Sequence, residues 1–99
     1  MDLLFLYGGQ RFVWDLEKAS VNLDKHGIAF EKACQVFFDP FVRLEDASDR
    51  GEPRSAATGL TEDWSMLFVV HLWRENDSIR IVSARSATAR ERRSYEDCE

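Results

Sequence analysis

The stretch WSMLFVVHLWRENDSIRIVSA, from Trp64 to Ala84, decides the fold class of this 99-residue chain. Its first part, up to Trp73, is rich in β-branched and aromatic residues with little alternation, which predicts a strand covered on both faces. The segment Ser78–Ala84 predicts the next strand, and Asn76-Asp77 predicts the hairpin tip between them. Consecutive strands joined by short turns indicate an antiparallel meander.

The expected hairpin brings a histidine and an arginine together. A two-residue tip pairs Trp73 with Arg80 and His71 with Val82, so His71 and Arg80 share one face of the sheet. A histidine diagonal to an arginine, beside a large aromatic side chain, could form a nucleotide platform. The alternative is a core histidine that is hydrogen-bonded to a neighbouring strand or helix, and the residues alone leave both interpretations open.

Two helices are predicted before these strands. The short strand pattern Arg11–Asp15 ends at Asp15, which suits a helix N-cap, and Gly27 suits the left-handed position that ends a helix. The first helix therefore spans residues 16–26. Its expected apolar face consists of Leu16, Ala19, Leu23 and His26.

The second helix begins at Phe30, without a good cap at Ala29, and ends at Asp39-Pro40 because the residue before proline avoids helical geometry. Its expected apolar face consists of Phe30, Ala33, Cys34 and Phe37.

The rest of the chain completes an α+β pattern. Residues 41–45 and 54–60 are candidate strands around a polar loop, and the capping box Thr88–Glu91 begins a helix from about Ala89 to Asp97. The element order β-α-α-β-β-β-β-α predicts a small antiparallel β-sheet packed with two N-terminal helices and a C-terminal helix.

Composition limits the function classes. The net charge of −5 argues against a generic nucleic-acid binder. Between Ile79 and Tyr95, however, the charged residues are five arginines and one acid, Glu91, so a local basic surface is expected. Cys34 and Cys98 form no disulfide framework, which favours a reduced, cytoplasmic protein. The His and Cys spacing suits no structural zinc, no segment suits a membrane span, and no cofactor is expected.

Three stretches taken together resemble the BrnT toxin family. They run from Trp14 to Pro40, from Val69 to Asp77 and from Ile79 to Glu96. The resemblance implies a RelE-like fold in one domain, residues 12–97, after an N-terminal extension or extra strand at residues 1–11. It implies a ribonuclease toxin of a type II toxin–antitoxin pair, which cuts RNA without a metal and so inhibits translation. It also implies a BrnA-type antitoxin whose ribbon-helix-helix domain binds operator DNA, so that the toxin meets DNA only through this partner.

Metal-free RNA cleavage needs proton-transfer groups and cations that stabilise the phosphorane. The catalytic candidates are His71, Arg80, Lys25, His26 and Arg85. Candidates for contact with RNA or antitoxin are Arg54, Arg90, Arg92 and Arg93. Each has a simpler interpretation: Lys25-His26-Gly27 suits an ordinary helix end, and the arginines suit a solvated surface.

Two functions therefore compete. The first is an endoribonuclease toxin, which the His and Arg set favours. The second is a non-catalytic toxin homologue that serves as antitoxin partner and transcriptional co-regulator. The low net charge favours this second function, as does Ser86, where the family usually has a basic residue.

Overall fold

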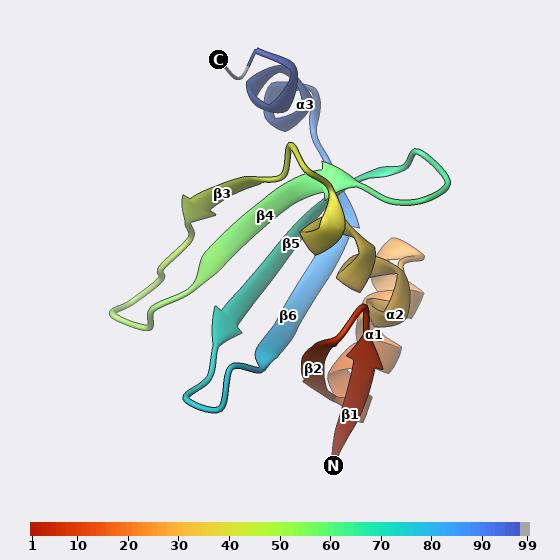
Figure 1. The fold of residues 1–99 in the computed structure, drawn as a ribbon, viewed down its shortest axis with the longest axis vertical. Coiled ribbons are helices and arrows are strands. Elements are labelled where there is room, and N and C mark those ends of the chain that lie inside the picture. The colour runs from red at the N-terminus through yellow and green to blue at the C-terminus, as the bar shows by residue number, and fades with distance from the viewer. Residues whose placement is uncertain (98–99) are drawn as a thin grey trace.

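A single six-stranded sheet, in the order β1-β2-β6-β5-β4-β3, forms the body of the protein (Figure 1). The computed structural model describes residues 1–97. The strands are β1 (Asp2–Tyr7), β2 (Gln10–Asp15), β3 (Arg43–Asp46), β4 (Ser55–Leu60), β5 (Met66–Trp73) and β6 (Ile79–Ser86). The helices are α1 (Leu16–His26), α2 (Phe30–Ala33), the 3₁₀ helix η1 (Cys34–Phe38) and α3 (Ala89–Glu96).

The predicted α+β class is confirmed, and β3 to β6 form the expected antiparallel meander. The prediction of an entirely antiparallel sheet is wrong, because β2 pairs in parallel with β6 through Phe12–Ile79 and Val13–Arg80. Between β2 and β6 the chain passes through the helices and β3–β5, a connection long enough for β6 to run beside β2 in the same direction. Residues 2–7 form strand β1, which pairs with β2 through a turn at Gly8 and Gly9, both with positive φ.

The predicted pairing of β5 with β6 is wrong near the hairpin tip. The Arg74 N–H donates to the Ser78 carbonyl and Asp77 has a φ of 61°, so the loop contains three residues rather than two. His71 consequently lies opposite Ile81. A bulge next to this pair, with Val82 as the extra residue, restores the expected pairing farther along the strands.

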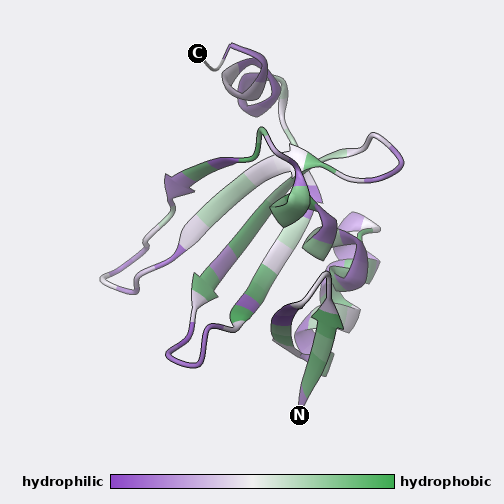
Figure 2. Ribbon diagram, in the orientation of Figure 1, coloured by the Kyte–Doolittle hydropathy of each residue, from purple (hydrophilic) through white to green (hydrophobic). Residues whose placement is uncertain are grey.

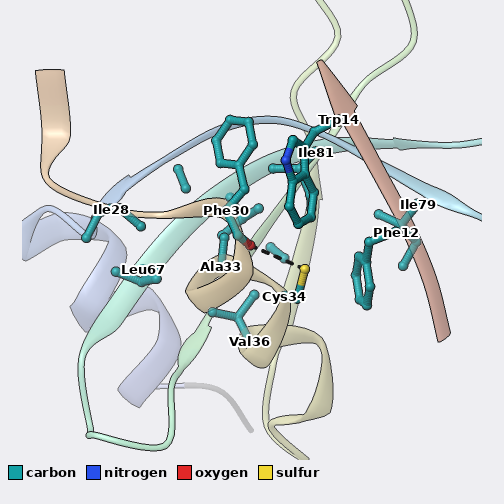
Figure 3. Close-up of a cluster of buried hydrophobic side chains, with 13 residues drawn as sticks. Phe12, Trp14, Ile28, Phe30, Ala33, Cys34, Val36, Leu67, Ile79 and Ile81 are labelled. Atoms are coloured by element: carbon teal, nitrogen blue, oxygen red, sulfur yellow. Dashed lines mark hydrogen bonds between the residues drawn. The ribbon is translucent and has the colours of Figure 1, made fainter. Parts of the chain in front are cut away.

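Helix α2 and η1 cover one face of the sheet and form the core with it (Figures 1 and 3). Phe30, Ala33 and Cys34 are fully buried, as their spacing predicted, and the Cys34 thiol contacts the Phe30 carbonyl at 3.3 Å. The helix starts at Ala29 without a side-chain cap, also as predicted. From the sheet, the buried side chains are Phe12, Trp14, Ala57, Leu67, Val69, Ile79, Ile81 and Ala84.

Helix α1 has the predicted ends but not the predicted face. Asp15 caps it by accepting from the Lys18 N–H, and Gly27 ends it with a φ of 71°. Leu16 and Leu23, expected in the core, are 42% and 49% exposed. The reason is that α1 lies beside β6 and buries only a narrow strip, in which the buried residue is polar Asn22.

Helix α3 begins at the predicted capping box of Thr88 and Glu91 and lies at the end of the sheet (Figure 1). It is hydrophilic along its length (Figure 2), and the Tyr95 hydroxyl donates to the Asp39 carboxylate at 2.5 Å. Cys98, predicted to be a reduced thiol in a polar tail, lies outside the described residues. Within residues 1–97, the helices are too short or too polar to cross a membrane.

Candidate functional site

The sheet face opposite α2 and η1 carries a row of side chains across four strands. In the strand register, Arg43 lies opposite Thr58, Thr58 opposite Phe68, and Phe68 opposite Arg85. The Arg85 guanidinium lies over the Phe68 ring, 4.3 Å from its centroid. We call this surface the open face. Its side chains on β5 and β6 include Phe68, Val70, Leu72, Arg80, Val82, Ser83 and Arg85.

Arg85 is held at this surface by the first turn of α3. Its two terminal nitrogens donate to the two Glu91 oxygens, both at 2.8 Å. This bidentate pair lowers the pKa of Glu91 and raises that of Arg85. Stacking on Phe68 and pairing with Glu91 together fix the guanidinium beside the end of β6.

Arg80 lies farther along β6 and reaches over β2 to the first strand. Its terminal nitrogens donate to the Asp2 carboxylate, and this hydrogen bond lowers the pKa of Asp2. The Arg80 Nε is buried and has no hydrogen-bond partner among the described residues. Arg80 therefore keeps a donor that its acidic partner does not satisfy.

A groove of about 410 Å³ separates α1 from the part of β6 between these two arginines. Val82 and Ser83, at the bulge, line its β6 side. On the α1 side, the exposed residues Lys25 and His26 line the groove at the C-terminal end of the helix. The α1 N-terminal end contributes Asp15, Glu17 and Lys18. The structure thus brings the predicted pair Lys25-His26 to a position beside β6.

Asn22 fixes α1 to β6, and the sequence prediction missed it. The Asn22 amide nitrogen donates to the carbonyls of Ala84 and Ile28 at 2.9 and 3.0 Å, and its oxygen accepts from the Ala84 N–H at 3.1 Å. The Asn22 amide therefore satisfies the backbone N–H and C=O of Ala84, as a neighbouring strand would, where β2 no longer pairs with β6. An asparagine inside a helix, where its propensity is poor, was the available signal.

His71 lies on the other face of the sheet from Arg80, so the predicted pairing of these two residues on one face is wrong. It is only 1% exposed, and its Nδ1 lies 3.2 Å from the Val69 carbonyl. Its ring meets Phe37 edge-to-face at 4.7 Å, and burial lowers its pKa. The geometry matches the core-histidine interpretation, because His71 points into the core with Val69. The three-residue hairpin loop places Arg80 on the other face.

The remaining candidates lie apart from the groove. Arg54 pairs with Glu52 at 3.0 Å and lines a separate pocket with Leu72 and Trp73. The other three, on the exposed surface of α3, are Arg90, Arg92 and Arg93. Within residues 1–97, no group of three or more His, Cys, Asp or Glu side chains could hold a metal ion.

Comparisons with known proteins give one family match and one similar fold. Residues 14–91 match the family described as the ribonuclease toxin BrnT of type II toxin–antitoxin systems. The fold is similar to the crystal structure of the Brucella abortus ribonuclease toxin BrnT, with a TM-score of 0.59 and 22% sequence identity. The match covers 76% of this chain and 92% of that one. No protein in the curated set matches this chain in sequence.

Proposed function

Because the chain belongs to the BrnT family of ribonuclease toxins from type II toxin–antitoxin systems, we propose that it cleaves RNA without a metal in the groove between α1 and β6. One observation carries this proposal: Lys25 and His26 line the same groove as Val82 and Ser83, which lie between Arg80 and Arg85 along β6. His26 as a proton-transfer group and Lys25 as a cation thus line one end of a space that is open to solvent, and Arg80 and Arg85 lie on either side of its β6 wall.

The reaction that fits these groups uses the RNA's own 2′-hydroxyl as nucleophile. His26 takes the hydroxyl proton, the 2′-oxygen bonds to phosphorus, and the bond to the leaving 5′-oxygen breaks. Lys25 lies next to His26, where its ammonium can stabilise the charged phosphorane. A proton from Lys25, or from the protonated His26, passes to the leaving 5′-oxygen and makes it a hydroxyl. The products are a 2′,3′-cyclic phosphate and a 5′-hydroxyl, so the step consumes no water and needs no metal.

The open face supplies the rest of the binding surface. Arg85 and Arg80 flank the groove and suit phosphates on either side of the cut bond. Phe68, with Arg85 stacked on it, offers a flat surface on which an unpaired base can stack. In this proposal His71 has a structural role, because its side chain lies in the core.

The proposed partner is a BrnA-type antitoxin with a ribbon-helix-helix domain, and the toxin would meet operator DNA only through it. Membership of a type II family supports a protein antitoxin in general terms. The exposed cations Arg90, Arg92 and Arg93 on α3, together with Arg54, are available to either RNA or this antitoxin. Cleavage of cytoplasmic RNA would inhibit translation.

One observation favours the non-catalytic alternative. Arg80 and Arg85 are both paired with carboxylates of the same chain, Asp2 and Glu91, which lowers the positive potential that RNA would meet. A toxin homologue with neutralised arginines could still bind its antitoxin and take part in transcriptional control.

Expression in a bacterial host separates the two functions. The chain is induced alone and together with a candidate antitoxin, sought as a small ribbon-helix-helix reading frame next to its gene, and growth and RNA ends are followed. Growth arrest with new RNA ends, both relieved by the partner, supports the ribonuclease. Normal growth and intact RNA, with tight partner binding, contradict it and support the non-catalytic alternative.

A further inference from the structure

Strand β1 is an outer strand of the sheet, and its free edge is apolar. The order of strands places β2 on one side of β1, and no described residue pairs with the other side. From Leu3 to Tyr7 the strand carries no charge, and it is coloured as hydrophobic in Figure 2. Leu4 and Leu6 are 66% and 68% exposed. Edge strands usually carry lysine, proline or a bulge that prevents pairing, and β1 has none of these.

The backbone of β1 has alternating hydrogen-bonding directions. The two-residue turn at Gly8 and Gly9 makes Tyr7 and Gln10 a hydrogen-bonded pair, so the N–H and C=O groups of the odd-numbered residues point toward β2. The Leu16 N–H bond to the Met1 carbonyl, at 2.9 Å, continues the same alternation. The even-numbered residues, Leu4 and Leu6 among them, therefore direct their backbone groups away from the sheet.

The same two leucines direct their side chains to the open face. Phe5 lies opposite buried Phe12, and Leu4 opposite Val13 on the other face. A strand that pairs with β1 must therefore accept backbone hydrogen bonds and cover exposed leucines at the same positions. A second β1 meets both requirements, because it presents the same groups in the same alternation.

We propose that two copies of this chain associate through antiparallel pairing of their β1 strands, which joins the two sheets edge to edge. A twofold axis perpendicular to the sheet keeps the open faces of both copies on one side. In the register that best covers apolar surface, Leu4 lies opposite Leu6 of the second copy and Phe5 opposite its counterpart. Shifting the register by one residue pair would instead place Asp2 opposite Leu6.

Charge and size set the strength of this association. No charged side chains face each other along Leu3–Tyr7, and Asp2 lies outside the paired leucines, bound to Arg80. The net charge of −5 on each copy opposes association, so added salt should strengthen the dimer. A contact of one short strand is at the small end of specific interfaces, so the dimer should dissociate on dilution. Strand β1 precedes the family match at residues 14–91, so the family match does not cover this edge.

Sedimentation velocity over a roughly hundredfold range of concentration tests the proposal. The wild-type chain should shift from monomer to dimer, and Leu6→Lys should remain a monomer because the lysine meets an apolar strand. Leu23→Lys makes the same change on exposed α1, away from the edge, and should dimerise like the wild type. A wild-type monomer throughout, or a dimer that survives Leu6→Lys, would overturn the proposal.

A second variant tests the backbone directly. Leu4→Pro removes an N–H that points away from β2, so the β1–β2 pairing should persist while the dimer weakens. Circular dichroism checks that the fold is kept. For the register, Leu4→Cys and Leu6→Cys variants are mixed under oxidation in a Cys98→Ser background. They should cross-link to each other more than to themselves, and preferential self-linkage would refute the register.

Discussion

The attachment of α1 to β6 through Asn22 gives the sharpest stability prediction. The side chain is buried and makes three hydrogen bonds, two to carbonyls and one from the Ala84 N–H. Asn22→Ala removes all three and leaves buried backbone groups without partners. At about 1 kcal/mol for each bond, the free energy of unfolding should fall by about 3 kcal/mol.

Urea denaturation measures this loss as a shift in midpoint at unchanged slope. Asn76→Ala is the matched control, since the exposed Asn76 bonds through its side chain only to nearby Ser78. Its loss should cost less than about 1 kcal/mol. An Asn22→Ala loss no larger than that of the control would refute the reasoning. In the folded fraction of Asn22→Ala, RNA cleavage should also slow, because Asn22 holds the helix that carries Lys25 and His26.

Three further changes test the charges around the site. Asp2→Asn frees Arg80 and should tighten RNA binding. The slope of the logarithm of the RNA-binding constant against the logarithm of salt concentration should steepen by about 0.7, as one added single-strand phosphate contact would. Fluorescence anisotropy measures this slope, and an unchanged slope counts against the prediction. Glu91→Gln keeps a capping-box residue but loses the charge, so stability should fall by about 0.5 to 1 kcal/mol at neutral pH. Because Arg85 lowers the folded-state pKa of Glu91, this difference should disappear as pH falls through that pKa, and a pH-independent difference would contradict it. Burial lowers the pKa of His71, so the wild type should lose stability as pH falls below the ordinary histidine value of 6.5. His71→Leu should reduce this loss in urea titrations and leave RNA cleavage intact. Loss of cleavage in the folded variant would indicate a catalytic role for His71.

Local signals in the sequence predicted most elements correctly. The cap at Asp15, the stop at Gly27 and the capping box that starts at Thr88 all depend on neighbouring residues, and each lies where it was expected. The core face of the second helix was also correct, because Phe30, Ala33 and Cys34 pack against a wide sheet.

Non-local geometry was not predictable in the same way. The three-residue hairpin loop, with its left-handed Asp77, placed Arg80 on the opposite face from His71. The bulge at Val82 then shifted the register back, and neither feature has a strong local signal. The apolar face of α1 was misplaced because pattern analysis assumes a helix that lies flat on a sheet, whereas this one lies beside a strand and uses Asn22 to bond to it. The parallel pairing of β2 with β6 is likewise a property of the whole chain.

The most direct test of the central claim is the cleavage rate of purified His26→Gln on single-stranded RNA, in the presence of a chelator. Lys18→Gln, at the other end of the same groove, is the control. If His26 transfers the proton, its variant should cut at least about 100-fold more slowly than the wild type, while the control stays close to it. A His26→Gln rate within about twofold of the wild type would contradict the groove as the catalytic site and return Lys25-His26-Gly27 to an ordinary helix end.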